Sequence, residues 1–137
     1  MKIHSDLRGI IRLTNADGYR YFVIFLDDYT RYRMMFLLSR KYQVLEAFKQ
    51  YKSWMENQTV RKIQVLHTDN GTEYCNSEFD RFVQDSVIQR ELTIPYSPSS
   101  NGVSERDMRT IAERARSNLI GANLSINGSR DQLYCIF

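Results

Sequence analysis

Polar and apolar residues follow patterns along this chain that predict five β-strands. Residues 2–7 alternate between polar and apolar side chains, whereas residues 19–26 are mostly apolar and rich in aromatic and β-branched side chains. Such a continuous apolar run is typical of a strand that is covered on both faces. The expected strands lie at residues 2–7, 19–26, 33–38, 62–66 and 88–92.

Three other segments change to the spacing of three and four residues that is typical of a helix. The first spans residues 42–56, a short second one begins at Ser77, and a long third one runs from Val103 to Gly121, where glycine can end it. Between the last expected strand and the last helix, residues 93–102 (TIPYSPSSNG) predict a loop. This order of elements predicts one α/β domain with a mixed sheet.

Three acidic residues fall where such a fold collects ligands. Asp6 lies in the first strand, Asp69 follows the fourth, and Glu105 lies in the first turn of the last helix. Ligands of α/β sheets bind at the carboxyl ends of strands, and three carboxylates brought together there repel one another unless cations bind them. Hard divalent metal ions take oxygen ligands, and two of them can activate a nucleophile against a phosphodiester.

Asp69 and Glu105 also have plainer interpretations. An aspartate after a strand is a common turn former, and a glutamate in the first turn of a helix interacts favourably with the helix dipole. The apolar stripe of the last helix consists of Met108, Ala112, Ala115 and Leu119, and Glu105 continues it one turn earlier. A carboxylate at such a place is costly unless something binds it, which favours the metal site.

Composition and charge add a candidate partner. The 137 residues are 42% hydrophobic and 26% charged, as in a soluble globular domain, and the net charge of +3 comes from 14 Arg against 5 Lys. Arg106, Arg109 and Arg116 share a side of the last helix and could contact a phosphate backbone. The alternative is a solvated face on which Glu113 pairs with Arg109. The longest apolar run, residues 21–26, is too short to cross a membrane.

The acidic residues lie within longer sequence motifs. HTDNGTEY at 67–74 and SPSSNGVSER at 97–106 place 35 residues between Asp69 and Glu105, and together they resemble the catalytic core of retroviral-type integrases. The chain is more narrowly similar to copia-type LTR retrotransposon integrase, over residues 3–120. The segments that carry this similarity are DLRG at 6–9, GYRYFVIFLDDYTRYR at 18–33, ENQTVRKIQVLHTDNGTEY at 56–74 and NGVSERDMRTIAERAR at 101–116.

The resemblance implies a ribonuclease-H-like fold, with a five-stranded mixed sheet flanked by helices. It implies that Asp6, Asp69 and Glu105 are catalytic and bind Mg²⁺ or Mn²⁺ in a two-metal site. The implied activity is metal-dependent 3′-end processing of element DNA and its transfer into target DNA. Asn101, Arg106, Arg109 and Arg116 are the expected nucleic-acid contacts. A homo-oligomer and a location in the nucleus or in a cytoplasmic virus-like particle are also implied.

Three positions depart from the pattern of the resembled family. Met108 stands where the family usually has Asn, Ile10 where it has Pro, and Val87 where it has Gly. Residues 1–120 are expected to form the catalytic core, and residues 121–137 are expected to be a truncated C-terminal extension.

Two alternatives remain open on the sequence. One is a degenerate or domesticated, non-catalytic domain of the same fold that binds nucleic acid or a protein. Met108 and the expected truncation favour this alternative, whereas the three intact acids oppose it. The other is a metal-dependent nuclease, which would use the same three acids and differ from a strand transferase only in the nucleophile.

Overall fold

The computed structural model describes residues 1–9, 18–93, 102–121 and 134–136, with the backbone alone described at 102–105, 118–121 and 134–136. In chain order the elements are β1 (Lys2–Gly9), β2 (Tyr21–Asp27), β3 (Arg33–Leu38), the 3-10 turn η1 (Lys41–Gln43), α1 (Val44–Thr59), β4 (Val65–Thr68), α2 (Ser77–Asp85), β5 (Gln89–Leu92), α3 (Gly102–Gly121) and β6 (Tyr134–Ile136). The strands form one sheet in the order β5-β4-β1-β2-β3-β6.

The sheet is mixed, as the sequence predicts. β1 pairs in parallel with β4, and β4 pairs in parallel with β5, whereas β1, β2 and β3 are joined by antiparallel pairing. All five expected strands are present. A sixth strand, β6, pairs antiparallel with β3 at the edge of the sheet, in a segment where the sequence pattern predicts no element.

The fourth strand begins later than the sequence pattern predicts. The expected strand covers residues 62–66, whereas β4 is Val65–Thr68. The backbone N–H of Ile63 donates a hydrogen bond to the Glu56 side chain of α1 (2.9 Å), so this residue belongs to the connection with the helix. Pairing with β1 begins at Lys2 and Val65, which leaves Asp69 immediately after the strand.

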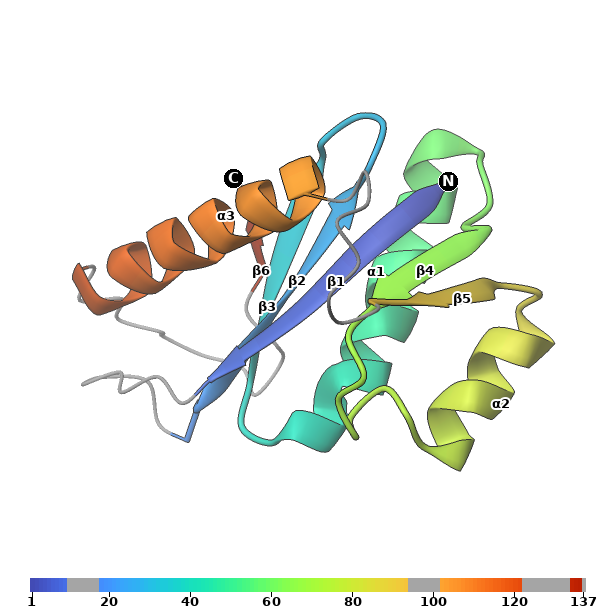
Figure 1. Ribbon diagram of the computed structural model, residues 1–137, viewed down its shortest axis with the longest axis horizontal. Coiled ribbons are helices and arrows are strands. Elements are labelled where there is room, and N and C mark those ends of the chain that lie inside the picture. Colours follow the sequence, from blue (N-terminus) through green and yellow to red (C-terminus); the bar gives the residue numbers. More distant parts are fainter. Residues whose placement is uncertain (10–17, 94–101, 122–133, 137) are drawn as a thin grey trace.

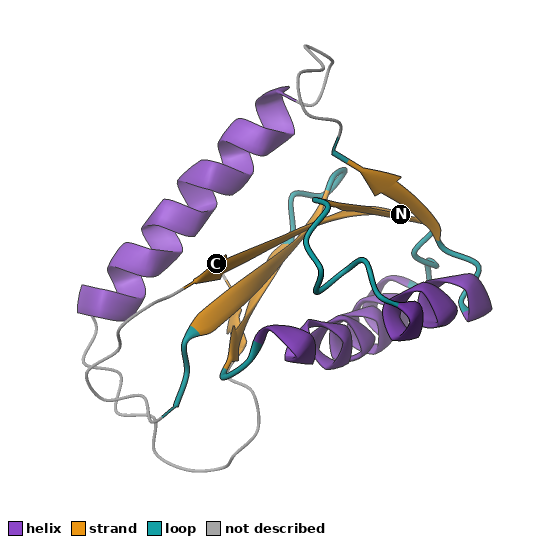
Figure 2. Cartoon of the chain, turned by 60° about the horizontal axis from the view of Figure 1, so that its bottom comes forward, coloured by secondary structure: helices purple, strands orange, loops and turns teal. Residues whose placement is uncertain are grey.

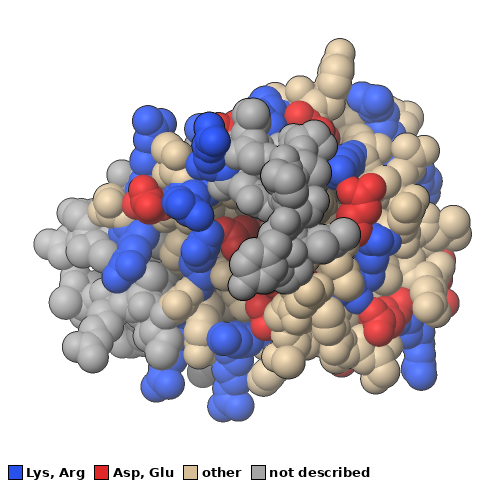
Figure 3. All heavy atoms as spheres, in the orientation of Figure 1, with Lys and Arg blue, Asp and Glu red and all other residues tan. Residues whose placement is uncertain are grey.

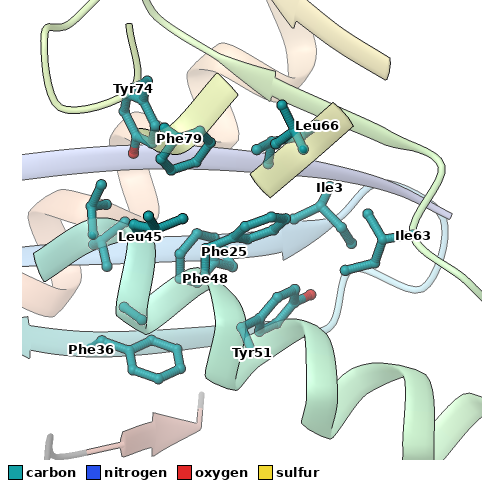
Figure 4. Packing of buried hydrophobic residues seen from close by; sticks show 14 of the residues in the cluster. Ile3, Phe25, Phe36, Leu45, Phe48, Tyr51, Ile63, Leu66, Tyr74 and Phe79 are labelled. Atoms are coloured by element: carbon teal, nitrogen blue, oxygen red, sulfur yellow. The ribbon is translucent and has the colours of Figure 1, made fainter. Parts of the chain in front are cut away.

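Helices cover the two faces of the sheet unequally. Figures 1 and 2 show α1 and α2 on one face and α3 alone on the other. The apolar stripe predicted for the first helix is confirmed, because all of its members are buried: Val44, Leu45, Phe48, Tyr51 and Met55. Figure 4 shows this core, in which the ring of Phe25 from β2 stacks on Tyr51 at 4.9 Å between centroids.

The face under α3 has a smaller apolar cluster. Three residues of the predicted helix stripe, Met108, Ala112 and Ala115, are buried there, while the side chain of Leu119 lies outside those described. They pack against side chains of β2 and β3, namely Phe22, Ile24, Leu26, Met35 and Leu37. In the part of the chain that the structure describes, no helix has the length and apolarity needed to span a bilayer.

The turn between β2 and β3 is held by its first aspartate. Asp27 is buried, and its Oδ2 accepts hydrogen bonds from the backbone N–H (3.1 Å) and the hydroxyl (2.5 Å) of Thr30. This side chain therefore satisfies donors of the turn, a common role of aspartate.

Val87 occupies a backbone conformation that suits glycine. It links α2 to β5 with φ 56°, in the left-handed region, and 86% of its surface is exposed. A β-branched residue is strained at positive φ, so the glycine usual in the resembled family fits this backbone better.

We expect Val87→Gly to raise the free energy of unfolding by roughly 0.5–1 kcal/mol. Relief of the left-handed strain, about 1–2 kcal/mol, outweighs the greater entropy of the unfolded glycine chain. Urea denaturation of both proteins measures the difference. Val87→Ala is the matched control, because alanine keeps the Cβ atom and should recover less of the strain. A glycine variant no more stable than the wild type would contradict this account.

Candidate active site

Two similar tripeptides, His-Ser-Asp and His-Thr-Asp, lie side by side on neighbouring strands and bring two acids together. His-Ser-Asp at 4–6 belongs to β1, and His-Thr-Asp at 67–69 ends β4 and continues past it. The parallel register pairs His4 with His67, and the same register continued by two residues sets Asp6 beside Asp69. Because side chains alternate between faces, the histidine and aspartate of each tripeptide share one face.

That face is the one covered by α3. Asp6 is the register partner of Ile24, which belongs to the apolar cluster beneath α3. A cavity of about 360 Å³ opens between these strands and the helix. Its lining residues are His4, Ser5, Asp6, Leu7, Arg8, His67, Thr68, Asp69, Thr93, Met108 and Arg109. Two of the three predicted catalytic acids therefore lie in one cavity.

The remaining predicted residues are only partly described. Glu105 lies in the first turn of α3, and the structure describes its backbone alone. Asn101 lies outside the described residues. The assignment of catalytic and metal-binding roles to Asp6, Asp69 and Glu105 thus stays a prediction.

Asp6 carries a carboxylate in an unfavourable environment. Its side chain is 19% exposed, and Oδ2 accepts a hydrogen bond from Arg8 Nε at 2.7 Å. Burial raises the pKa of Asp6 above its ordinary value of 3.8, Arg8 counteracts this effect, and the negative charge of Asp69 adds a smaller upward shift. The nearby arginine therefore compensates the buried charge incompletely.

Asp69 is positioned by the turn that follows it. Its Oδ1 accepts a hydrogen bond from the backbone N–H of Gly71 at 2.8 Å, and the N–H of Tyr74 in turn donates to the Gly71 carbonyl at 3.0 Å. The buried Tyr74 hydroxyl lies 2.7 Å from the Ser5 hydroxyl on β1. The motif HTDNGTEY thus folds into a turn that is fastened to the strand carrying Asp6.

The two histidines of the tripeptides are site residues that sequence reasoning missed. Their rings lie 5.1 Å apart and are buried. His4 Nε2 lies 2.8 Å from Asp28 Oδ1, and His67 Nε2 lies 2.9 Å from the Thr93 hydroxyl. The similarity of the two tripeptides is the signal that could have revealed the pair, provided that both strands are parallel neighbours.

A chain of charged groups ties the first turns of α3 to the sheet. Arg31, in the turn between β2 and β3, forms an ion pair with Asp107 of α3. Arg31 Nη1 also lies 3.8 Å from Asp28 Oδ1, the atom that contacts His4. The helix turn that contains Glu105 is therefore anchored close to β1.

Arginines gather beside the acids. A second cavity, of about 350 Å³, is lined by Arg8, Gly9, Phe22, Arg109, Ala112, Glu113 and Arg116. Arg8 and Arg109 line both cavities, whereas Arg106 is exposed and lines neither. Arg109 and Glu113 are both exposed, as a solvated face requires, but within the described residues no ion pair joins them, so the pairing predicted in the alternative is not observed. Figure 3 shows basic side chains gathered over the part of this face where Figure 1 draws α3.

The residues present fit part of a metal site. Two carboxylates, one on β1 and one immediately after β4, line one cavity, and oxygen donors of this kind suit Mg²⁺ or Mn²⁺. The incompletely compensated charge of Asp6 gives a cation an electrostatic reason to bind. Among the described side chains no three His, Cys, Asp or Glu form a ready metal-binding group, so the two aspartates would supply only part of the ligand set.

Comparisons with known proteins show what this chain is similar to. Residues 2–98 match a family model described as integrase core domain. The chain is 38% identical over 122 residues to a retrovirus-related Pol polyprotein from transposon TNT 1-94 of Nicotiana tabacum, covering 89% of this chain and 9% of the relative. It is also 38% identical over 111 residues to the corresponding polyprotein from transposon RE1 of Arabidopsis thaliana, covering 81% and 7%. The chain thus spans less than a tenth of these curated relatives.

Solved structures match the fold. The catalytic core domain of HTLV-2 integrase, in a trimeric form in complex with magnesium, aligns with a TM-score of 0.63 and 18% identity, covering 90% of this chain and 74% of that one. The catalytic core domain of BIV integrase aligns with a TM-score of 0.61 and 17% identity, covering 93% and 86%. The predicted ribonuclease-H-like fold and the copia-type resemblance are confirmed.

We expect Asp6→Asn to stabilise the fold in metal-free buffer at pH 7. A raised carboxyl pKa in the folded state means that its contribution to stability is fully present below pH 3.8 and is lost as the pH rises through the raised pKa. Asparagine does not titrate, so the variant avoids this loss. Thermal melts from pH 3 to pH 7 in EDTA should show its advantage growing as the pH rises.

Asp69→Asn is the control for this stability test. Asparagine keeps an oxygen that can accept the hydrogen bond from the Gly71 N–H, and position 69 is exposed. The melting temperatures of Asp69→Asn should therefore follow those of the wild type more closely than the melting temperatures of Asp6→Asn do. An Asp6→Asn variant less stable than the wild type at pH 7 would mean that the ion pair with Arg8 outweighs the cost of burial.

Proposed function

This chain belongs to the integrase core domain family of retrotransposon Pol polyproteins, and we propose that it is a metal-dependent catalytic core that cleaves and joins DNA. The observation that carries this proposal is the placement of Asp6 and Asp69 side by side in one cavity, by the register of β1 and β4. DNA is the proposed partner, through the ends of the element and a target duplex. The location that goes with this proposal is the nucleus or a cytoplasmic virus-like particle.

In this proposal the two aspartates are metal ligands and Glu105 is the third. Position 105 precedes Met108 by three residues in α3, and Met108 lines the cavity that holds both aspartates. The Arg31–Asp107 ion pair holds this end of the helix against the strands. Divalent metal ions bound there would activate a hydroxyl nucleophile and stabilise the leaving oxygen of a phosphodiester.

The chain's other residues would orient the DNA. Arg109 lines the cavity that holds the two aspartates. Together with Arg8 and Arg116 it also lines the neighbouring cavity. Phosphates could therefore be held beside the acids, on the side of α3. Arg106 and Asn101 extend the proposed contact surface along α3 and the preceding loop. The nucleophile is water in end processing and a DNA 3′-hydroxyl in strand transfer, and both reactions would use the same acids.

A second candidate function has one observation in its favour. Met108 is 6% exposed and lines the cavity beside Asp6 and Asp69, where the resembled family usually has an asparagine. A thioether cannot replace the amide's hydrogen bonds. A domain that binds DNA without catalysis would tolerate this change, so the activity test must separate the two functions.

We expect metal-dependent strand cleavage or joining on a branched DNA that mimics the integration product. Asp6→Asn, Asp69→Asn and Glu105→Gln should each lower the rate by roughly 100-fold or more, because loss of even a supporting residue of a metal site costs about 10–100-fold. The measurement is gel analysis of labelled strands with Mg²⁺ or Mn²⁺ and with EDTA. Glu46→Gln, which removes an exposed acid at the start of α1, should leave the rate unchanged.

Calorimetry of metal binding completes this test. If the wild type forms no product and binds no metal, catalysis is excluded and the second candidate function, DNA binding without catalysis, is supported. Activity that survives all three substitutions at the proposed ligands would refute their assignment.

A further inference from the structure

Arg8 stands between two differently charged environments. Its side chain is 47% exposed and lies at the boundary of the two cavities, because it lines both. On one side its Nε donates to Asp6 Oδ2 at 2.7 Å. On the other side it faces the cavity lined by Arg109 and Arg116 of α3.

The arginine-lined cavity is a candidate phosphate site. Three guanidinium groups from β1 and α3 surround it, against one carboxylate, Glu113. Neither Arg109 nor Arg116 forms an ion pair with another described residue, so both can donate to an incoming anion. Arginine forks match the oxygens of a phosphodiester and bind them in a bidentate manner.

The ion pair between Arg8 and Asp6 can be exchanged at low cost. The Arg8 side of the pair is half exposed, so water and salt screen it and its release leaves no guanidinium buried. A divalent cation at Asp6 would compete directly with the guanidinium for the same carboxylate oxygens. It would also repel the guanidinium, because both carry positive charge.

We propose that Arg8 is an exchangeable counter-ion, which neutralises Asp6 in the metal-free protein and moves to the cavity of Arg109 and Arg116 when a divalent cation binds. There it completes a site for a phosphodiester group of DNA. The inference rests on the proposed function, since it requires the cation at Asp6. Metal binding and DNA binding are then coupled through one side chain, and Arg8 acts as a positioning residue.

DNA binding at several salt concentrations tests this exchange. The probe is a fluorescein-labelled duplex, followed by anisotropy with the full chain, in EDTA and in a fixed concentration of Mg²⁺. Each arginine–phosphate contact contributes about 0.9 to the slope of log K against log [NaCl]. Arg8→Gln should lower the magnitude of this slope by about 1 in Mg²⁺ and leave it unchanged in EDTA.

Three further variants make the result specific. Arg116→Gln should lower the slope under both conditions, because its contact does not depend on the metal. Arg81→Gln, an exposed arginine of α2 that lines neither cavity, should change nothing. Arg8→Lys should keep most of the metal-dependent slope, since the charge is retained. Melting curves in EDTA establish that each variant is folded.

Calorimetry with Mg²⁺ alone supplies a readout without DNA. Arg8→Gln should bind the cation several-fold more tightly than the wild type, because a competing cation has been removed. An equal slope change with and without Mg²⁺, or an unchanged metal affinity, would overturn the exchange while leaving the proposed function intact. A wild type that binds no Mg²⁺ and cleaves no DNA would overturn both.

Discussion

The parallel pairing of β1 with β4 is the constraint on which the candidate site depends. It sets His4 opposite His67, and the same register continued sets Asp6 beside Asp69. A shift of one residue would turn one aspartate to the opposite face, because side chains alternate along a strand. The register is itself fixed by burial, since Ile3 and Leu66 are partners in it and both belong to the core beneath α1 and α2.

The unequal covering of the sheet decides where function can reside. Among the described residues, 18 buried apolar side chains fill the face under α1 and α2, against 8 under α3. The centre of the first face is filled by aromatic packing, in which Phe25 contacts Phe36, Phe48 and Tyr51. On the second face one helix leaves two cavities beside its apolar stripe, and the acids and arginines line them. The helix is held in place by Arg31 and Asp107 as well as by packing.

The spacing of apolar residues predicted five of the strands and all three helices. It could do so because each of these elements buries one or both of its faces, and the buried side chains recur with the period of the element. The places of Asp6 and Asp69 relative to the predicted strands, together with the resemblance, indicated these two residues as site residues. The ion pair of Arg8 with Asp6 was not predicted, although the period of two along β1 places both side chains on one face. β6 was missed because a strand of three residues at an edge carries too little pattern to distinguish it from a loop.

The departures from the family pattern differ in kind, and the structure explains why. Val87 is exposed, so its left-handed backbone carries a local cost that does not reach the cavity. Met108 instead lies at the contact between α3 and the sheet, within the apolar cluster and also at the wall of the cavity. A methionine there adds apolar contact that fixes the helix, at the expense of a polar group beside the carboxylates. The Met108 side chain both anchors α3 and borders the acids. At this one position, therefore, a gain in the packing of α3 comes with the loss of a polar group from the site.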